Sequence, residues 1–271
     1  MPATISPLAL LRPLQCLLLL VIATTVAAQS SADQEFTIDR LDWQKEMKPG
    51  SHLVVRNPWG DIRIRQTGGS TGLVHAVMQK IGEQPKVAEL KVVSETDERV
   101  EIAFVYPEGE EPASFSEGRI DVAIMTPYGN TTEVHADRGR VITKTMEDKL
   151  TVRATDTALE LKSKGPLDVE TVAAPVVLQI VNGEAGDRGR IVTQRGNIEI
   201  RYYINEKVEF HMTSGASKTT NDLPLLRSRG RDGRSVTMSH GEDVARYTLQ
   251  SDTGNIILNN LGGDLSAGDA D

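Results

Sequence analysis

Four arginines in one short segment are the residues whose type and spacing most directly suggest a chemistry. The segment "RSRGRDGR" contains Arg227, Arg229, Arg231 and Arg234. A guanidinium group presents a planar fork of N–H donors that matches phosphate, sulfate and carboxylate groups. The segment therefore predicts an anion-binding loop. The alternative is a solvated loop whose arginines pair with nearby acids such as Asp222 and Asp232.

Acids on predicted strands suggest a second chemistry, that of an enzyme acting on polysaccharide. Glu160, Asp168 and Glu170 occupy outward positions of such strands. Strands stacked about 4.8 Å apart would bring acids on neighbouring strands to the roughly 5–9.5 Å that separates glycosidase carboxyl pairs. Outward acids are also ordinary on a solvated strand face. A polysaccharide lyase or hydrolase is therefore the alternative to a protein that is not an enzyme.

Other patterns that carry catalysis or metal binding are missing from the sequence. None of the five histidines belongs to a Gly-x-Ser-x-Gly turn or a His-Glu-x-x-His motif. The group His240, Glu242 and Asp243 is typical of a solvated turn. The only cysteine, Cys16, lies near the N-terminus, so the rest of the chain has neither a disulfide nor a thiolate ligand. We predict no catalytic residue, no metal site and no cofactor.

The N-terminal segment 1–28 has the pattern of a secretory signal peptide. Arg12 is followed by the apolar run 17–23 and by the small residues Val26, Ala27 and Ala28. The apolar run is too short for a membrane span of about 20 residues, and Gln15 before Cys16 disfavours a lipoprotein. We expect an exported protein, periplasmic or extracellular, with no transmembrane segment in the mature chain.

The net charge bears on the class of partner. The whole chain carries a formal charge of −8, which becomes −9 when Arg12 is removed with the signal peptide. An acidic balance disfavours nucleic acid as a partner. The partners that remain are an envelope glycan, lipopolysaccharide or a protein.

The elements that must position these residues are short strands. In "GDIRIRQ", Ile62 and Ile64 alternate with Asp61, Arg63 and Arg65, as side chains on the two faces of a strand do. The same alternation recurs in "RVEIAFVY", "GRIDVAIM", "PLDVETV" and "NIEIRYY", and helical periodicity is almost absent. The predicted fold class is all-β.

Regular spacing and single glycines indicate how these strands are connected. The phrases "GDIRI" at 60–64 and "GNIIL" at 254–258 repeat one pattern near opposite ends of the chain. Glycine adopts a positive φ at the lowest steric cost and so suits a sharp corner before a strand. Two half-coils of about nine residues would form one turn of a β-solenoid or β-helix, a stack in which successive coils bury their apolar rows together. The predicted corner glycines are Gly60, Gly139, Gly165, Gly196 and Gly254.

The sequence also predicts how the chain is divided. After the signal peptide at 1–28, residues 29–50 form a leader or capping segment. Residues 51–260 form one solenoid domain, irregular over 51–125 and regular over 126–260, with a loop at 217–235. Residues 261–271 form a flexible acidic tail. Open ends of a stack can pair edge to edge, but nothing in the sequence requires an oligomer.

Three groups of residues resemble a known family, the bacterial putative adhesins of the DUF4097 type. The similar pieces are Val54–Ile64, Ile120–Gly129 and the phrases that begin at Gly139, Gly196 and Gly254. They lie within residues 51–260. The resemblance implies an exported, β-solenoid-like bacterial protein, and it supplies no catalytic residues. We therefore expect a non-enzymatic, adhesin-like protein that offers an interaction surface at the cell envelope.

Overall fold

The computed structural model describes residues 36–82, 85–108, 110–181, 184–203, 207–215, 219–221, 226–229 and 235–261. The chain divides into two compact units, 1–35 and 36–271, and every described residue belongs to the second unit. The described regular structure is entirely β-strand, which confirms the all-β prediction. Within this part of the chain, no helix is long and apolar enough to cross a membrane. The predicted signal peptide at 1–28 and residues 262–271 of the predicted tail lie outside the described residues.

Nineteen strands are described. They are β1 Phe36–Glu46, β2 His52–Trp59, β3 Ile62–Thr67, β4 Thr71–Ile81, β5 Glu89–Glu95, β6 Arg99–Val105, β7 Gly118–Pro127, β8 Thr131–Thr143, β9 Leu150–Ser163, β10 Leu167–Thr171, β11 Val176–Ile180, β12 Gly186–Thr193, β13 Ile198–Tyr202, β14 Val208–Ser214, β15 Thr219–Asn221, β16 Leu226–Arg229, β17 Ser235–His240, β18 Ala245–Ser251 and β19 Ile256–Asn260.

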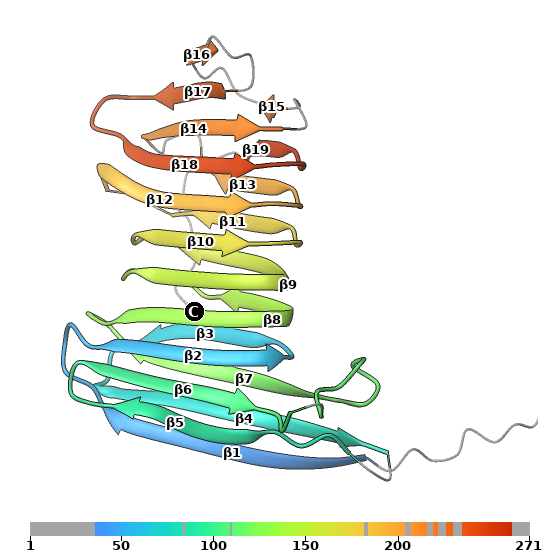
Figure 1. Cartoon of the computed structure of the whole chain (residues 1–271). Helices are drawn as coiled ribbons and strands as arrows, with labels where there is room; N and C mark the ends of the chain where they lie inside the picture. The colour runs from blue at the N-terminus through green and yellow to red at the C-terminus, as the bar shows by residue number, and fades with distance from the viewer. Residues whose placement is uncertain are drawn as a thin grey trace, which may run out of the picture. The chain divides into compact units, whose positions relative to one another are not determined.

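Most strands belong to one of two parallel ladders (Figure 1). The first ladder has the order β6, β2, β8, β9, β10, β12, β18, β14. The second has the order β7, β3, β8, β9, β11, β13, β19, β15. The long strands β8 and β9 contribute their first halves to the first ladder and their second halves to the second. One passage of the chain through both ladders is called a coil below.

Register along the first ladder gives the relative length of the coils. Glu133 pairs with Thr151, Thr151 with Asp168, and Asp168 with Arg190. The first two of these steps are nearly equal. The third step is longer, and β12 begins at Gly186, three residues before Gly189, its first residue paired with β10.

Alternation along the strands separates the core from the outer faces. Ile62 and Ile64 on β3 are buried, whereas Arg63 and Arg65 between and after them are exposed. Ile256 on β19 is also fully buried, and all three isoleucines belong to one continuous hydrophobic cluster. A fully buried isoleucine stabilises the fold by about 1.5–3 kcal/mol. One coil holds only a few such residues, so the coils are stable only when stacked.

The two ends of the described stack depart from sequence order. The coil β2–β3 lies between the later strands β6–β7 and β8, and the coil β18–β19 lies between the earlier strands β12–β13 and β14–β15. Beyond them the pairing becomes antiparallel, through β5 on β6 and β1 on β4 on β7 at one end, and through β16 on β17 on β14 at the other. The sequence predicted a capping segment at 29–50, where β1 lies, but not the antiparallel pairing, which covers edges that a parallel ladder would otherwise leave unpaired.

The repeated phrases occupy equivalent places in this arrangement. Gly60 precedes β3 and Gly254 precedes β19, and each belongs to a coil inserted one step from an end of the stack. Gly60, Gly139 and Gly196 have positive φ, as predicted for corners. For Gly165 and Gly254 the prediction of positive φ is wrong. They are required for space, because a Cβ would overlap the carbonyl oxygen of Glu147 at Gly165 and that of Gly196 at Gly254.

In both phrases, the backbone N–H of the residue after the glycine donates to a polar side chain of a neighbouring segment. Asn197 Oδ1 accepts a hydrogen bond of 2.9 Å from the backbone N–H of Asn255 on the next coil. At the other end, Asp121 Oδ1 accepts one of 3.0 Å from the backbone N–H of Asp61. These side chains satisfy backbone donors where the regular ladder is interrupted.

The segment predicted as a loop at 217–235 contains regular structure. β15 and β16 lie within it, and β17 begins at its last residue. β15 continues the second ladder next to β19, and β16 pairs antiparallel with β17. Both are short and lack the alternation that marks longer strands, so the sequence pattern does not reveal them. Residues 217–218, 222–225 and 230–234 of this segment lie outside the described residues.

Candidate functional site

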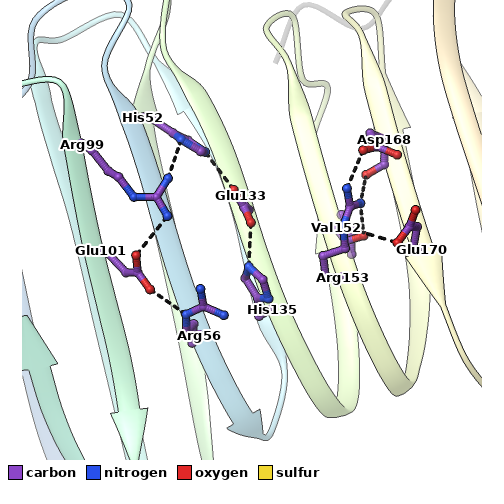
Figure 2. Close-up of polar contacts among 10 residues, drawn as sticks. All are labelled: His52, Arg56, Arg99, Glu101, Glu133, His135, Val152, Arg153, Asp168 and Glu170. Carbon is purple, nitrogen blue, oxygen red and sulfur yellow. Dashed lines mark hydrogen bonds and ion pairs between the residues drawn. The ribbon is translucent and has the colours of Figure 1, made fainter. Parts of the chain in front are cut away.

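The outer face of the first ladder brings ionisable side chains from distant parts of the sequence together (Figure 2). Side chains at every second position of a strand point away from the core. In parallel ladders with aligned register, outward residues from successive strands form rows across the face. One row contains Arg56, His135, Arg153 and Glu170, contributed by β2, β8, β9 and β10.

The first group on this face, the histidine cluster, consists of His52, Arg56, Arg99, Glu101, Glu133 and His135. Glu133 lies between two imidazoles, with Oε1 2.7 Å from His135 Nε2 and Oε2 3.2 Å from His52 Nε2. The second contact does not have the geometry of a hydrogen bond. On its other side, His52 Nδ1 lies 3.0 Å from Arg99 Nη1. His52 is thus enclosed between a carboxylate and a guanidinium group.

The second group, the arginine cluster, consists of Arg153 on β9, Asp168 and Glu170 on β10, and Arg190 on β12. Arg153 Nη2 donates to Asp168 Oδ2 at 2.5 Å, and Arg153 Nε lies 3.7 Å from Glu170 Oε2. Arg190 Nη1 lies 3.4 Å from Asp168 Oδ1 and also donates to Glu170. The two acids of β10 are therefore held between arginines from the strands on either side.

A hollow of about 430 Å³ lies between the two clusters. His135 of the histidine cluster lines it together with Arg153 and Glu170 of the arginine cluster. Asp137 and Thr155 also line the hollow, and Thr155 Oγ1 donates to Asp137 Oδ1 at 3.0 Å. The hollow thus offers hydrogen-bond donors and acceptors of both charges, an arrangement suited to a polar ligand.

The ion pairs shift the pKa values of several of these groups. Hydrogen bonds from Arg56, at 2.7 Å, and from Arg99, at 2.9 Å, lower the pKa of Glu101. Burial acts to raise the pKa of Asp168, but the hydrogen bonds and charges of Arg153 and Arg190 together outweigh this effect, so the pKa is lowered. Burial lowers the pKa of His52, and the attraction of Glu133 only partly opposes it. Glu101 and Asp168 therefore remain ionised at neutral pH.

The lowered pKa of Asp168 makes it unsuited to act as the general acid of a glycosidase. A general acid at neutral pH requires a carboxyl group with a raised pKa, whereas the pKa of Asp168 is lowered. Among the described residues, no three histidine, cysteine, aspartate or glutamate side chains are grouped so that they could hold a metal ion. The outer face is thus built from reciprocally paired charges.

The three acids considered as catalytic candidates do not lie together. Asp168 and Glu170 share the first ladder, as described above. Glu160 lies in the second half of β9, where it pairs in register with Val177 of β11, and so belongs to the second ladder. Glu160 is therefore separated from the other two candidates, because β9 turns a corner between its two halves.

The predicted anion-binding arginines are only partly described. The backbones of Arg227 and Arg229 lie in β16, opposite Met238 and Val236 of β17. Arg231 and Arg234 lie outside the described residues. Anion binding by these four arginines therefore stays a prediction.

Sequence reasoning missed Arg153 and Arg190 of the arginine cluster and most residues of the histidine cluster. Arg153, Asp168 and Arg190 come from three successive coils, and only the register of the first ladder makes them neighbours. The available signal was that outward charged residues recur along the sequence at intervals close to the length of one coil. The unequal length of the coils obscured it.

The chain was compared with known proteins. No family model and no curated protein sequence matches it. A solved structure described as a "putative cell adhesion protein" from Clostridium sporogenes is 12% identical, with 81% of this chain and 99% of that chain covered and a TM-score of 0.46. A "putative adhesin" from Bacteroides fragilis is 11% identical, with coverages of 82% and 97% and a TM-score of 0.32. A "putative adhesin" from Parabacteroides merdae is 8% identical, with coverages of 82% and 96% and a TM-score of 0.36. TM-scores of this size do not establish a common fold.

Proposed function

We propose that the chain is an exported, non-enzymatic, adhesin-like β-solenoid protein whose outer faces bind a partner at the cell envelope. The two parallel ladders, joined by corner glycines, support the solenoid architecture. The signal-like segment at 1–28 supports export. A bacterial periplasm or cell surface would be the place of action, and the partner would be a glycan, lipopolysaccharide or a protein.

One observation carries the proposal that the protein binds rather than catalyses. On the outer face of the first ladder, arginines and acids from consecutive strands neutralise one another, as in the pairs of Arg153 with Asp168 and Arg56 with Glu101. Reciprocal pairing fixes these side chains, and the lowered pKa of Asp168 removes it as a proton donor. Such a face favours surface recognition over acid–base chemistry.

A sedimentation experiment tests this function. The chain from residue 29 is mixed with fragments of bacterial envelope, and saturable co-sedimentation that excess unlabelled chain abolishes is expected. The double variant Asp168→Asn/Glu170→Gln provides the test for catalysis on a panel of polysaccharides, with new reducing ends and unsaturated products measured. We expect no turnover by either protein. Turnover by the wild-type chain that the double variant lacks would establish the enzyme instead.

A further inference from the structure

A row of cations follows the outer face of the second ladder. Arg65 on β3 lies beside Lys144, since the preceding residues Ile64 and Thr143 pair in register and Lys144 N donates to Ile64 O at 2.9 Å. Lys162 on β9 comes next, because its backbone N–H donates to Thr143 Oγ1 at 2.7 Å. Strands are about 4.8 Å apart, so β3, the residue after β8, and β9 present positive charge at successive steps of the ladder.

These cations differ from those of the first ladder in having no acidic partner. Among the described residues, no carboxylate lies within ion-pair distance of Arg63, Arg65, Lys144 or Lys162. The Arg65 guanidinium contacts the sulfur of Met125 at 3.0 Å instead. Four such cations close together on a chain of net charge −8 form a locally positive surface.

Two hollows lie along this row and connect its charges. One, of about 290 Å³, is lined by Arg63, Arg65 and Lys144, and the other, of about 470 Å³, by Lys144 and Lys162. Ile142 lines both hollows, and other aliphatic side chains contribute to their walls. The surface therefore combines an apolar floor with positive charges along one side.

We infer that this cationic row binds a linear acidic polysaccharide, with carboxylate or sulfate groups on Arg65, Lys144 and Lys162 and sugar rings against Ile142. The inference rests on the proposed function and names the ligand class. Charges that repeat once per strand match a polymer that carries one acidic group per sugar unit. Nucleic acid fits less well, because the whole chain is acidic and no aromatic side chain of the described residues lines either hollow for base stacking.

Glu160 allows a test of whether the bound ligand is negatively charged. It lines the second hollow together with Lys144 and Lys162, in a position to repel an acidic ligand. Neutralising Glu160 should therefore strengthen binding of a polyanion. A surface whose cations serve only solubility would not respond in this way.

The experiment uses polygalacturonate, a linear polymer with one carboxylate per sugar, as the probe. The triple variant Arg65→Gln/Lys144→Gln/Lys162→Gln is compared with a control of equal charge, Lys91→Gln/Lys149→Gln/Arg195→Gln, whose residues are exposed elsewhere. Affinities are measured by calorimetry, with thermal unfolding as a check of folding. Because each exposed ion pair contributes modestly, we expect about tenfold weaker binding for the triple variant. The control should bind like the wild type, Glu160→Gln about threefold more tightly, and added salt should weaken binding.

Several outcomes would overturn the inference. Equal affinities of the triple variant and its control would exclude this row as the site. Binding of polyglutamate or of a DNA oligonucleotide as tight as that of polygalacturonate would exclude a polysaccharide as the preferred ligand. Absence of polygalacturonate binding combined with retained co-sedimentation with envelope fragments would reject the ligand class and leave the proposed function intact. Loss of both would reject the function as well.

Discussion

At the scale of single residues, Asp61 links two neighbouring strands at a corner. Its side chain is 9% exposed, and its Oδ2 lies 2.9 Å from Arg140 Nη2 and 3.1 Å from Arg119 Nη2. Burial acts to raise the pKa of Asp61, but the hydrogen bonds and charges of the two arginines outweigh it, so the pKa is lowered. A lowered pKa means that the ionised form stabilises the folded state.

We therefore expect Asp61→Asn to lower the free energy of unfolding at neutral pH. The loss should be about 1–2 kcal/mol, since the Arg140 side chain is half exposed and the ion pair is partly screened. The greater unfolding free energy of the wild type, compared with Asp61→Asn, is fully present above the unfolded-state pKa of about 3.9. It disappears as the pH falls through the lower pKa that Asp61 has in the folded state. Denaturant unfolding at several pH values measures this, and exposed Asp156→Asn is the control. An equal difference between Asp61→Asn and wild type at all pH values would contradict the assignment.

Gly254 allows a second prediction at this scale. Because a Cβ there would overlap the Gly196 carbonyl oxygen, Gly254→Ala forces two backbone segments apart. We expect a loss of at least about 2 kcal/mol, seen as a lower thermal midpoint. The control is Gly68→Ala, where a Cβ meets nothing within 4 Å. Similar midpoints for the two variants would show that the corner can relax.

At the scale of elements, the alternation of apolar residues and the placement of glycines made most strands predictable. The sequence did not show which strands pair with one another. The outward direction of Asp168 and Glu170 follows from their alternate positions. Their pairing with Arg153 and Arg190 depends on coils of unequal length, and coil length is set by connections whose sequence has no periodic pattern. For the same reason, the row formed by Arg65, Lys144 and Lys162 could not be found before the register was known. Local sequence patterns specify which residues form a strand, whereas the pairing of strands distant in sequence determines which side chains meet on the surface.

The histidine cluster, whose residues come from β2, β6 and β8, leads to a prediction about how stability depends on pH. The pKa of His52 is lowered in the folded state by burial. Between that lowered pKa and about 6.5, the unfolded chain binds the proton more readily, so stability should fall as the pH decreases through this range. His52→Gln should remove this part of the dependence, measured as a flatter plot of unfolding free energy against pH. His211→Gln, at an exposed position of β14, is the control, and an unchanged plot for His52→Gln would refute the prediction.

At the scale of the whole described unit, long-range insertion determines which strands are protected. β18 pairs with β12 on one side and with β14 on the other, and β19 likewise joins β13 to β15. A chain that ends after Asp243 would therefore lose one coil and expose the edges of several strands at once. Unpaired edges promote association between molecules.

We accordingly expect termination after Asp243 to produce soluble aggregates or insoluble protein. Termination after Leu261, which removes no described strand, should leave a monodisperse chain with the unfolding midpoint of the full sequence. Size-exclusion chromatography with light scattering distinguishes the two. A monomeric, cooperatively unfolding chain ending at Asp243 would show that the inserted coil is dispensable.

The late position of β18 and β19 in the sequence also has a consequence for how the molecule is made. A ribosome delivers the chain from its N-terminus, so β12 to β15 are synthesised before the coil that separates them. Until the last residue of β19 has emerged, β14 and β15 lack the neighbours they have in the finished molecule, and premature contact with β12 and β13 would have to be undone. Contacts between such distant residues form slowly. Completion of this end of the stack therefore has to wait until β19 has been synthesised.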